Sequence, residues 1–217
     1  MIWKDGILYA SGRPVKGDRI VGKLRVWPPE RSKLAALFYL GNGPDIQLSD
    51  YILYLGAAAG TTVSFIADYA GIVYAVEMAP EPLPQLLNVC RIKKNVIPIP
   101  ADASSPEIYA PLVGLVDILY QDIAQRNQVE IVVNNLQFLR SGGLVILMLK
   151  VKSISSQRNP VEVCEEAIST LEKSGVQDIG LTWLDEYHRG HVAIMGYKND
   201  SPKQIRTAVT RSRASYD

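Results

Sequence analysis

The stretch "YILYLGAAAGTTVSFIADYAGIVYAVE", residues 51–77, decides the fold that the rest of the sequence must fit. An apolar run ends at a loop rich in glycine and alanine, a helical pattern follows, and a second apolar run ends in Glu77. This order is typical of a nucleotide-binding α/β unit. The dinucleotide fingerprint G-x-G-x-x-G is incomplete, however, because alanines stand where its second glycine belongs.

The missing glycine bears on the class of ligand. A pyrophosphate needs bare backbone and a helix N-terminus against it, whereas this loop suits a ligand with a ribose and no phosphate. Gly56 and Ala57 keep side chains small at the turn, and Thr61 and Thr62 offer hydroxyls where the helix begins. Glu77 stands where an acid accepts hydrogen bonds from ribose hydroxyls. The loop therefore favours S-adenosylmethionine over a dehydrogenase cofactor or a purely structural turn.

Size and composition limit the class of protein. A chain of 217 residues, 47% of them apolar, suits one large domain, with or without a small appendage. No apolar run approaches the ~20 residues that span a bilayer, and the first residues, MIWKDG, lack the apolar region of a signal peptide. Cys90 and Cys164 have no metal-ligand spacing around them, so we expect reduced core thiols and no bound metal. We expect a soluble, cytoplasmic protein without membrane contact.

The net charge of +1 hides an uneven distribution. Residues 1–33 carry eight basic and three acidic side chains, and residues 198–217 carry five and two. The residues between them carry ten basic and seventeen acidic side chains. Basic ends suit contact with a polyanion such as RNA, although charged termini are often only solvated.

The chain from residue 51 onward alternates short β-rich runs with helical patterns. This alternation predicts an α/β fold, with a mostly parallel sheet between helices. The expected strands are residues 51–55, 72–76, 96–99, 116–120 and 144–150.

Three further patterns complete the expected architecture. Ser105-Pro106 and Asn159-Pro160 each place an N-cap before a proline and predict helix starts, the second helix stopping at Gly175. Residues 176–184 and 191–197 read as strands with no helix between them, which predicts an antiparallel pair at one edge.

The expected division of the chain follows from these patterns. Residues 1–30 form a small β-rich N-terminal region, and residues 31–198 form a Rossmann-like methyltransferase domain that opens with a helix near residues 31–40. Residues 199–217 form a basic tail with little core-forming content, which we expect to be mobile.

Polar residues follow the later strands as well. Asp102 comes after the third strand, where it can reach an adenine amino group, and Asp122 follows the fourth over the centre of the sheet. Lys150 ends the fifth strand, closely followed by Lys152. Because parallel strands end at one edge of the sheet, we expect Glu77, Asp102, Asp122 and Lys150 to share a site.

Six segments resemble signature segments of the fibrillarin family and occur in the same order as in that family. They are "RSKLAA", "YLGAAAGTTVS", "VYAVE", "LLNVCRIKKNVIPI", "ADA" and "VDILYQDIAQ". The resemblance covers roughly residues 25–197. It implies an S-adenosylmethionine-dependent ribose 2′-O-methyltransferase of ribosomal and transfer RNA, in an archaeal form. It also implies the catalytic subunit of a box C/D guide ribonucleoprotein, with guide RNA, target RNA, a Nop-family scaffold and a kink-turn RNA-binding protein as partners.

The resemblance also implies site residues. The cofactor contacts fall on Thr61, Thr62, Glu77, Met78, Asp102, Ala103 and the segment from Asp122 to Gln125. The catalytic group falls on Lys33, Asp122, Lys150 and His191, the last where related ribose methyltransferases often have an acid.

The sequence departs from the family pattern in three places. Ala59 stands where the family commonly has serine. The segment "EMAPEP", which begins at Glu77, lacks the basic residue that the family tends to carry there, and Arg126 stands where a proline usually follows the DxAQ motif. These departures bear on partner and RNA contacts more than on the cofactor.

A ribose hydroxyl is a poor nucleophile until its proton is removed or polarised. We expect Lys150 to be the base or its main polarising partner, since the apolar strand before it predicts burial, which favours a neutral amine. Lys33 would steady the alkoxide or a phosphate, and Asp122 would orient Lys150 and the methyl donor. His191, alone at the start of an edge strand, is as readily a structural residue.

Two other function classes stay open at this point. A stand-alone methyltransferase acting on a protein side chain or a small molecule would use the same cofactor loop. A non-catalytic scaffold would keep the fold alone, but the acidic and basic residues at the strand ends argue against it.

Overall fold

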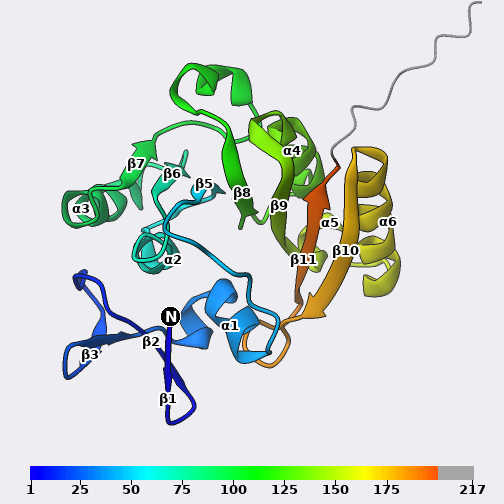
Figure 1. The fold of residues 1–217 in the computed structure, drawn as a ribbon. Helices are drawn as coiled ribbons and strands as arrows, with labels where there is room; N and C mark the ends of the chain where they lie inside the picture. Colours follow the sequence, from blue (N-terminus) through cyan, green and yellow to red (C-terminus); the bar gives the residue numbers. More distant parts are fainter. Residues whose placement is uncertain (200–217) are drawn as a thin grey trace, which may run out of the picture.

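A central sheet organises the 199 N-terminal residues, which are those that the computed structural model describes (Figure 1). Its seven strands within these residues run in the order β10-β11-β9-β8-β5-β6-β7. Five are parallel, as predicted: β5 (Tyr51–Leu55), β6 (Ile72–Val76), β7 (Val96–Ile99), β8 (Val116–Gln121) and β9 (Leu139–Lys150). The predicted antiparallel edge is confirmed by two strands, β10 (Val176–Trp183) and β11 (His191–Lys198).

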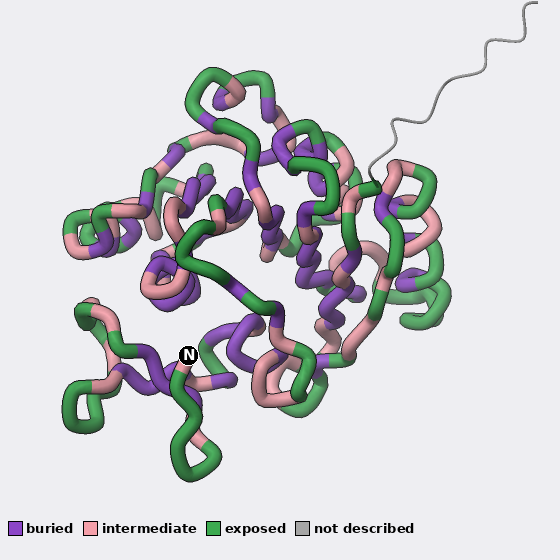
Figure 2. Tube along the Cα trace, viewed as in Figure 1, coloured by how far each residue is buried: buried purple, intermediate pink, exposed green. Residues whose placement is uncertain are grey.

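Helices cover both faces of this sheet. Packed on one face are α1 (Lys33–Tyr39), α2 (Thr61–Ile66) and α3 (Leu83–Ile92). Packed on the other are α4 (Gln128–Asn135), α5 (Val151–Ile154) and α6 (Pro160–Lys173). Figure 2 shows the result, with buried residues gathered in the strands and on the inner sides of the helices. None of the helices within residues 1–199 has the length and apolar character that a membrane crossing needs.

The parallel strands read as unbroken apolar runs because both of their faces are buried. In β5, Leu53 and Leu55 pack toward α4 and α6, whereas Ile52 and Tyr54 pack toward α1 and α2. Alternate side chains of a strand point to opposite faces, so a strand inside a sandwich of helices needs apolar residues at every position. The predicted strand ends of β5, β6 and β7 match the structure residue for residue.

Of the two helix starts predicted from a proline after an N-cap, the structure confirms one. Asn159 caps α6 as predicted, since its side chain accepts a hydrogen bond from the Val161 amide at 3.0 Å. The helix predicted after Ser105 was wrong: the chain forms two short 3₁₀ turns, η2 (Pro106–Ile108) and η3 (Ala110–Leu112). Pro111 has no N–H to donate and its ring clashes with the preceding turn, so an α-helix cannot continue through it.

The N-terminal strands form a separate antiparallel sheet, which confirms the predicted β-rich region. Its order is β1-β2-β4-β3, and its members are β1 (Ile2–Lys4), β2 (Ile7–Ala10), β3 (Arg19–Val21) and β4 (Leu24–Val26). The turn η1 (Pro29–Arg31) leads from it into α1, and η4 (Leu136–Phe138) lies between α4 and β9. The exact domain boundaries stay a prediction, and the predicted tail lies outside the described residues from residue 200 onward.

Arg25 ties this small sheet to the main body. Its side chain is fully buried and donates hydrogen bonds to Asp18 at 2.6 Å and to Asp68 at 2.5 Å. The guanidinium also lies 4.1 Å from the ring centroid of Phe65, on which Trp27 stacks. Strand β4 therefore shares a core with α2.

Both cysteines are free thiols. Cys164, on α6, is buried in the core, and burial raises its pKa. Cys90, on α3, is only partly buried and packs against the core, so the prediction of two core cysteines holds fully for Cys164 alone.

Candidate active site

A hollow of about 390 Å³ opens at the edge where the parallel strands end. It is lined by Gly56, Ala58, Val76, Glu77, Met78, Ala79, Pro80, Ala101, Asp102, Ala103, Asp122, Ile123 and Gln125. All of these residues are described, and they include three carboxylates and no basic side chain. This lining suits a ligand without phosphate.

Glu77 is held in a fixed orientation at the end of β6. One carboxylate oxygen accepts the Ala58 amide proton at 2.8 Å, and the other accepts that of Ala79 at 2.7 Å. The residue is 9% exposed. Each carboxylate oxygen has a second lone pair, so Glu77 can accept further hydrogen bonds from a diol placed in the hollow.

Asp102 also lines the hollow, on the segment that follows β7. Its Oδ1 accepts a hydrogen bond from the Ser104 amide at 2.8 Å, which fixes the side chain. The Oδ2 atom accepts none from the described residues, and it is available to a donor such as an exocyclic amino group.

Gly56 allows the ends of β5 and β8 to approach each other. Its φ angle is +82°, and a Cβ atom there would lie 2.7 Å from the Asp122 carbonyl oxygen. Any larger residue would both strain the backbone and push Asp122 away. Glycine is therefore required at position 56 for two reasons, the predicted turn and the close packing against Asp122.

The structure places Ala57, Thr61 and Thr62 outside the lining of the hollow, unlike the other predicted cofactor residues. Ala57 is 5% exposed and donates its amide proton to the Val76 carbonyl at 3.0 Å. The Thr62 hydroxyl donates to Ser32 Oγ at 3.1 Å, and Ser32 caps α1. Thr62 thus joins two helices in the core. Ala58, with a φ angle of +46°, takes the place at the hollow that Ala57 was expected to have.

Lys33 and Asp122 form an ion pair at one end of the hollow. The Lys33 ammonium donates to both carboxylate oxygens of Asp122, at 2.8 and 2.9 Å. The two side chains are 19% and 21% exposed. Lys33 is the first residue of α1, so the packing of α1 against the sheet joins residues that lie 89 positions apart.

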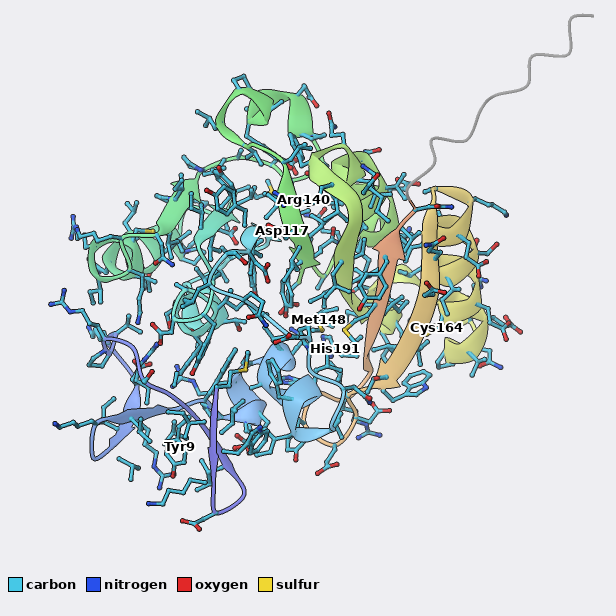
Figure 3. The ribbon with its side chains drawn as sticks, viewed as in Figure 1. Tyr9, Asp117, Arg140, Met148, Cys164 and His191 are labelled. Carbon is cyan, nitrogen blue, oxygen red and sulfur yellow. The ribbon has the colours of Figure 1, made fainter. Side chains whose placement is uncertain are left out.

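His191 adds an imidazole to this pair. Figure 3 shows it beside Met148, on the side of the sheet where α1 lies. Burial lowers the pKa of His191 below its usual 6.5, and the charge of Lys33 acts in the same direction. Its Nδ1 lies 3.3 Å from the Arg189 carbonyl oxygen. Because a carbonyl only accepts, that nitrogen carries the proton, and Nε2 keeps a free lone pair.

Lys150 is the register partner of His191 across β9 and β11, so the two side chains leave the same face of the sheet. The structure corrects its predicted environment, because Lys150 is exposed at the end of a buried strand. Asp122 also binds Lys33, not Lys150. The apolar run before Lys150 predicted burial, but the strand leaves the core at this residue.

Gln128, the first residue of α4, belongs to the site and was missed from the sequence. It is fully buried, donates to the carbonyls of Lys150 at 3.1 Å and Gln125 at 2.9 Å, and accepts the Lys150 amide proton at 2.9 Å. Strand β8 ends at Gln121 and therefore cannot pair with Lys150. The Gln128 carboxamide provides the backbone hydrogen bonds that a neighbouring strand would otherwise make. A glutamine beginning a helix carries no signal of such a role.

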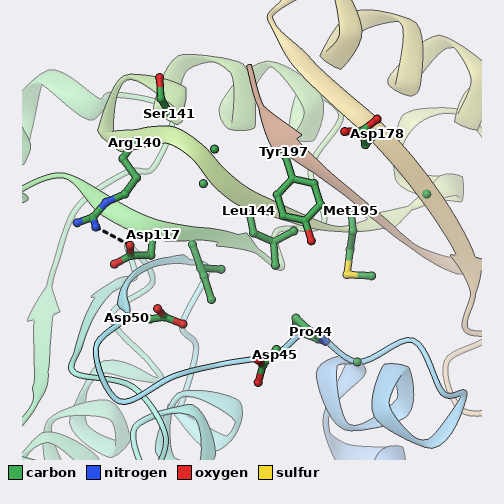
Figure 4. Close-up of a pocket in the computed structure, with 15 residues that line it drawn as sticks. Pro44, Asp45, Asp50, Asp117, Arg140, Ser141, Leu144, Asp178, Met195 and Tyr197 are labelled. Carbon is green, nitrogen blue, oxygen red and sulfur yellow. Dashed lines mark ion pairs between the residues drawn. The ribbon is translucent and has the colours of Figure 1, made fainter. Parts of the chain in front are cut away.

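A second hollow, of about 480 Å³, opens at the opposite edge of the sheet (Figure 4). Asp45, Asp50 and Asp178 line it, together with an ion pair of 2.7 Å between Arg140 and Asp117. Open α/β sheets bind ligands at the carboxyl ends of their strands, and this hollow lies at the amino ends of β5 and β8. The candidate active site is therefore the hollow beside Lys33 and Asp122.

Comparison with known proteins agrees with this geometry. The family model described as Fibrillarin matches residues 9–200. The chain is 50% identical to the fibrillarin-like rRNA/tRNA 2′-O-methyltransferase of Methanoculleus marisnigri, covering 90% of this chain and 98% of that protein. The corresponding protein of Methanospirillum hungatei is 46% identical, with 90% and 95% covered.

Two solved structures extend the similarity to the fold. A fibrillarin in complex with Nop5p superposes with a TM-score of 0.83 at 38% identity, covering 88% of this chain and 94% of that one. Aeropyrum pernix fibrillarin with natively bound S-adenosyl-L-methionine gives a TM-score of 0.76 at 39% identity, covering 86% and 85%. The chain belongs to the fibrillarin family.

Proposed function

We propose that this chain methylates ribose 2′-oxygens of ribosomal and transfer RNA with S-adenosylmethionine as the methyl donor. One observation carries the proposal: the Lys33–Asp122 ion pair, 2.8 Å long, lies beside a hollow lined by carboxylates without a basic residue. The hollow suits a nucleoside without phosphate, and the ion pair and His191 suit a hydroxyl acceptor. The names of the relatives given above support the same activity.

The donor set of the hollow fits S-adenosylmethionine. Glu77 would accept hydrogen bonds from its ribose hydroxyls and Asp102 one from its adenine amino group, while Met78 and Ile123 line the hollow for the flat base. When bound, this cofactor would supply a methyl group whose bond to sulfur breaks as the ribose oxygen bonds to the carbon, and the neutral thioether S-adenosylhomocysteine would leave.

The side chains around Asp122 would divide the work of activating the hydroxyl. His191 Nε2 would take the hydroxyl proton as the new carbon–oxygen bond forms, and would later release it to solvent. The Lys33 ammonium, held by Asp122, would stabilise the negative charge that develops on the oxygen. Lys150, exposed on the same face, would bind a phosphate next to the reacting ribose. We do not assign the role of base to Lys150, because its exposure does not favour the neutral amine that this role requires.

The same proposal includes partners. The fibrillarin of known structure that is bound to Nop5p supports a Nop-family scaffold as one partner. Guide RNA, target RNA and a kink-turn RNA-binding protein would complete a box C/D particle, in which base pairing with the guide selects the target. We infer a cytoplasmic location in an archaeal cell, where these RNAs are processed.

The test is a transfer experiment with methyl-labelled cofactor and three kinds of acceptor. The chain is assembled with the Nop-family scaffold, the kink-turn protein and a guide RNA, and it is offered target RNA, protein extract or small metabolites. We expect label only in the guided RNA. Label in protein or metabolites without RNA would contradict the proposal and support a stand-alone methyltransferase. Absence of cofactor binding in calorimetry would support a non-catalytic scaffold.

A further inference from the structure

A further cavity, of about 540 Å³, lies where α5 and the end of β10, with the turn that leads to β11, meet the start of α6. It is lined by Val151, Lys152, Pro160, Trp183, Asp185, Arg189 and Gly190. None of these residues belongs to the cofactor hollow or to the catalytic group described above.

The wall of this cavity is continuous with the catalytic residues. Val151 follows Lys150 in the chain, Gly190 precedes His191, and the Val151 amide donates to the Gly190 carbonyl at 3.2 Å. Trp183 is the register partner of Val192, which packs toward α6, whereas His191 leaves the opposite face. Two strand spacings, roughly 10 Å, separate the strand of Trp183 from that of Lys150.

The side chains at the mouth are those that a nucleotide needs. Trp183 is 39% exposed, and its ring contacts no aromatic ring among the described residues. The side chains of Lys152 and Arg189 are exposed and make no hydrogen bond or ion pair within residues 1–199. Asp185 accepts the Gly190 amide proton at 2.6 Å, so it shapes the turn and leaves Arg189 unpaired.

An exposed aromatic ring beside unpaired cations is the usual means of binding single-stranded RNA, since bases stack on the ring and phosphates meet the cations. Pro160 adds the N-terminal end of α6, whose dipole favours an anion. In the amino-edge hollow, by contrast, Arg140 is paired with Asp117, and three further aspartates disfavour a phosphate.

We propose that this cavity binds an unpaired nucleotide of the target strand that flanks the guide-paired segment, with its base stacked on Trp183 and its phosphate between Lys152 and Arg189. The inference rests on the proposed function and adds a substrate subsite to it. The subsite would hold the strand in register while the reacting ribose lies on the other side of β11, near His191.

The test combines protein variants with altered RNA in the assembled complex. Target strands carry a single abasic nucleotide at successive unpaired positions that flank the guide-paired segment, so that the loss of a base does not disturb pairing with the guide. With wild-type protein, we expect one position at which the base loss raises the KM for RNA about fivefold or more, the range of base–aromatic stacking. Trp183→Ala should raise the KM for intact RNA similarly, leave kcat unchanged and make the abasic substitution at that position silent.

Four further variants sharpen the result. Trp183→Phe should keep most of the affinity, because a phenyl ring still stacks. Tyr197→Ala removes an aromatic side chain of similar exposure, 47%, at the far end of β11 and should change nothing. The double variant Lys152→Met, Arg189→Met should weaken RNA binding and flatten its salt dependence, whereas Lys94→Met on another surface should not.

Two outcomes overturn the subsite and one overturns its premise. An unchanged KM in Trp183→Ala, or equal abasic effects in wild type and variant, would refute it even though methylation proceeds normally. Absence of RNA methylation by the wild-type complex would instead refute the proposed function.

Discussion

The ion pair of Lys33 and Asp122 is the residue-scale feature on which the proposed chemistry depends. It joins the first residue of α1 to the end of β8, and about a fifth of each side chain is exposed. The pair is thus open to substrate on one side and closed by protein on the other. In this position a carboxylate can direct an ammonium toward a developing charge.

Asp122→Asn tests this pair without changing its shape. We expect kcat to fall by about 10²–10³-fold, the effect of removing one preorganised electrostatic group. Methyl-transfer kinetics at saturating cofactor measure the change. Asp117→Asn is the matched control, because Asp117 forms an ion pair of 2.7 Å with Arg140 at the opposite edge. An equal loss in the two variants would show a structural effect instead.

His191 predicts a pH dependence whose direction follows from its surroundings. Burial, and secondarily the charge of Lys33, lowers the pKa of its imidazole below 6.5, so the neutral base is present at pH 7. The value of kcat/KM should therefore be flat near neutral pH and fall as the pH drops through this lowered pKa.

The acid limb of the pH profile should disappear in His191→Gln, along with much of the activity. His188→Gln is the comparison: its ring lies 6.2 Å from that of His191, but its Nε2 contacts the Pro29 carbonyl at 2.7 Å, so the acid limb should remain. A wild-type acid limb that persists unchanged in His191→Gln would assign the titration to another group.

The connection between β8 and α4 is the element that holds the site in shape. Gln128 binds both backbone groups of Lys150 and the carbonyl of Gln125, and it is fully buried. One side chain thus couples the loop at the cofactor hollow to the strand end that carries Lys150. A buried amide in this role must have all of its partners, because each unpaired backbone group costs free energy.

Gln128→Leu should leave those backbone groups unpaired and lower the free energy of unfolding by about 1–3 kcal/mol. Hydrogen exchange should become faster at residues 122–127, and KM for the cofactor should rise. Urea unfolding and exchange measurements check both effects. Gln137→Leu is the control, because Gln137 is an exposed glutamine bonded only to the Asn134 carbonyl within the described residues. Slow exchange retained in Gln128→Leu would contradict the coupling.

The N-terminal sheet depends in the same way on one buried side chain. Arg25→Met would leave the buried Asp18 without a cation and Asp68 with Lys93 alone, so we expect a loss of about 3–5 kcal/mol in unfolding free energy. The exposed Arg31, which donates to the Gly17 carbonyl, provides the comparison: Arg31→Met should cost little. Similar stabilities of the two variants would mean that the sheet is not anchored by Arg25.

Predictability from sequence differed between elements and contacts for physical reasons. Strands buried on both faces are unbroken apolar runs, so β5, β6 and β7 could be read directly. The capped start of α6 was equally clear, whereas Pro111 ended the helix expected after Ser105. Local patterns of this kind do not require knowledge of what packs against them.

Contacts between distant segments could not be read in this way. The strand ends predicted a shared site that includes Glu77, Asp102 and Asp122, because topology alone places them together. The partner of Asp122 depends on how α1 packs, and the Thr62 hydroxyl is used by Ser32 in the core. The exposure of Lys150 likewise depends on where the sheet ends. The role of Gln128 had no sequence signal.

At the scale of the whole molecule, charge separates the two edges of the sheet. Aspartates dominate the amino-edge hollow, where Arg140 is the one basic residue of the lining, whereas the carboxyl edge carries Lys33, Lys150, Lys152 and Arg189 beside the carboxylates of the cofactor hollow. A polyanion is attracted to the second edge and repelled from the first. RNA should therefore approach the molecule from the side on which the cofactor binds.

The isolated chain should bind RNA weakly, without sequence preference and with strong salt dependence. Contacts with phosphates release counterions, so affinity falls as salt rises, and the aromatic subsite around Trp183 is too small to read a sequence. Fluorescence titrations with unrelated RNAs at several salt concentrations measure this behaviour. Tight, sequence-selective binding by the purified chain would show that target choice does not depend on partners.

The most direct test of the central claim is to map the methyl group at single-atom resolution on a guided RNA. The assembled complex receives two targets that differ only in the 2′-hydroxyl of the guided nucleotide, one with ribose and one with 2′-deoxyribose. We predict one methyl group on the 2′-oxygen of the ribose target, by mass spectrometry, and none on the deoxy target. Equal methylation of both targets, or a methyl group on a base, would contradict the account.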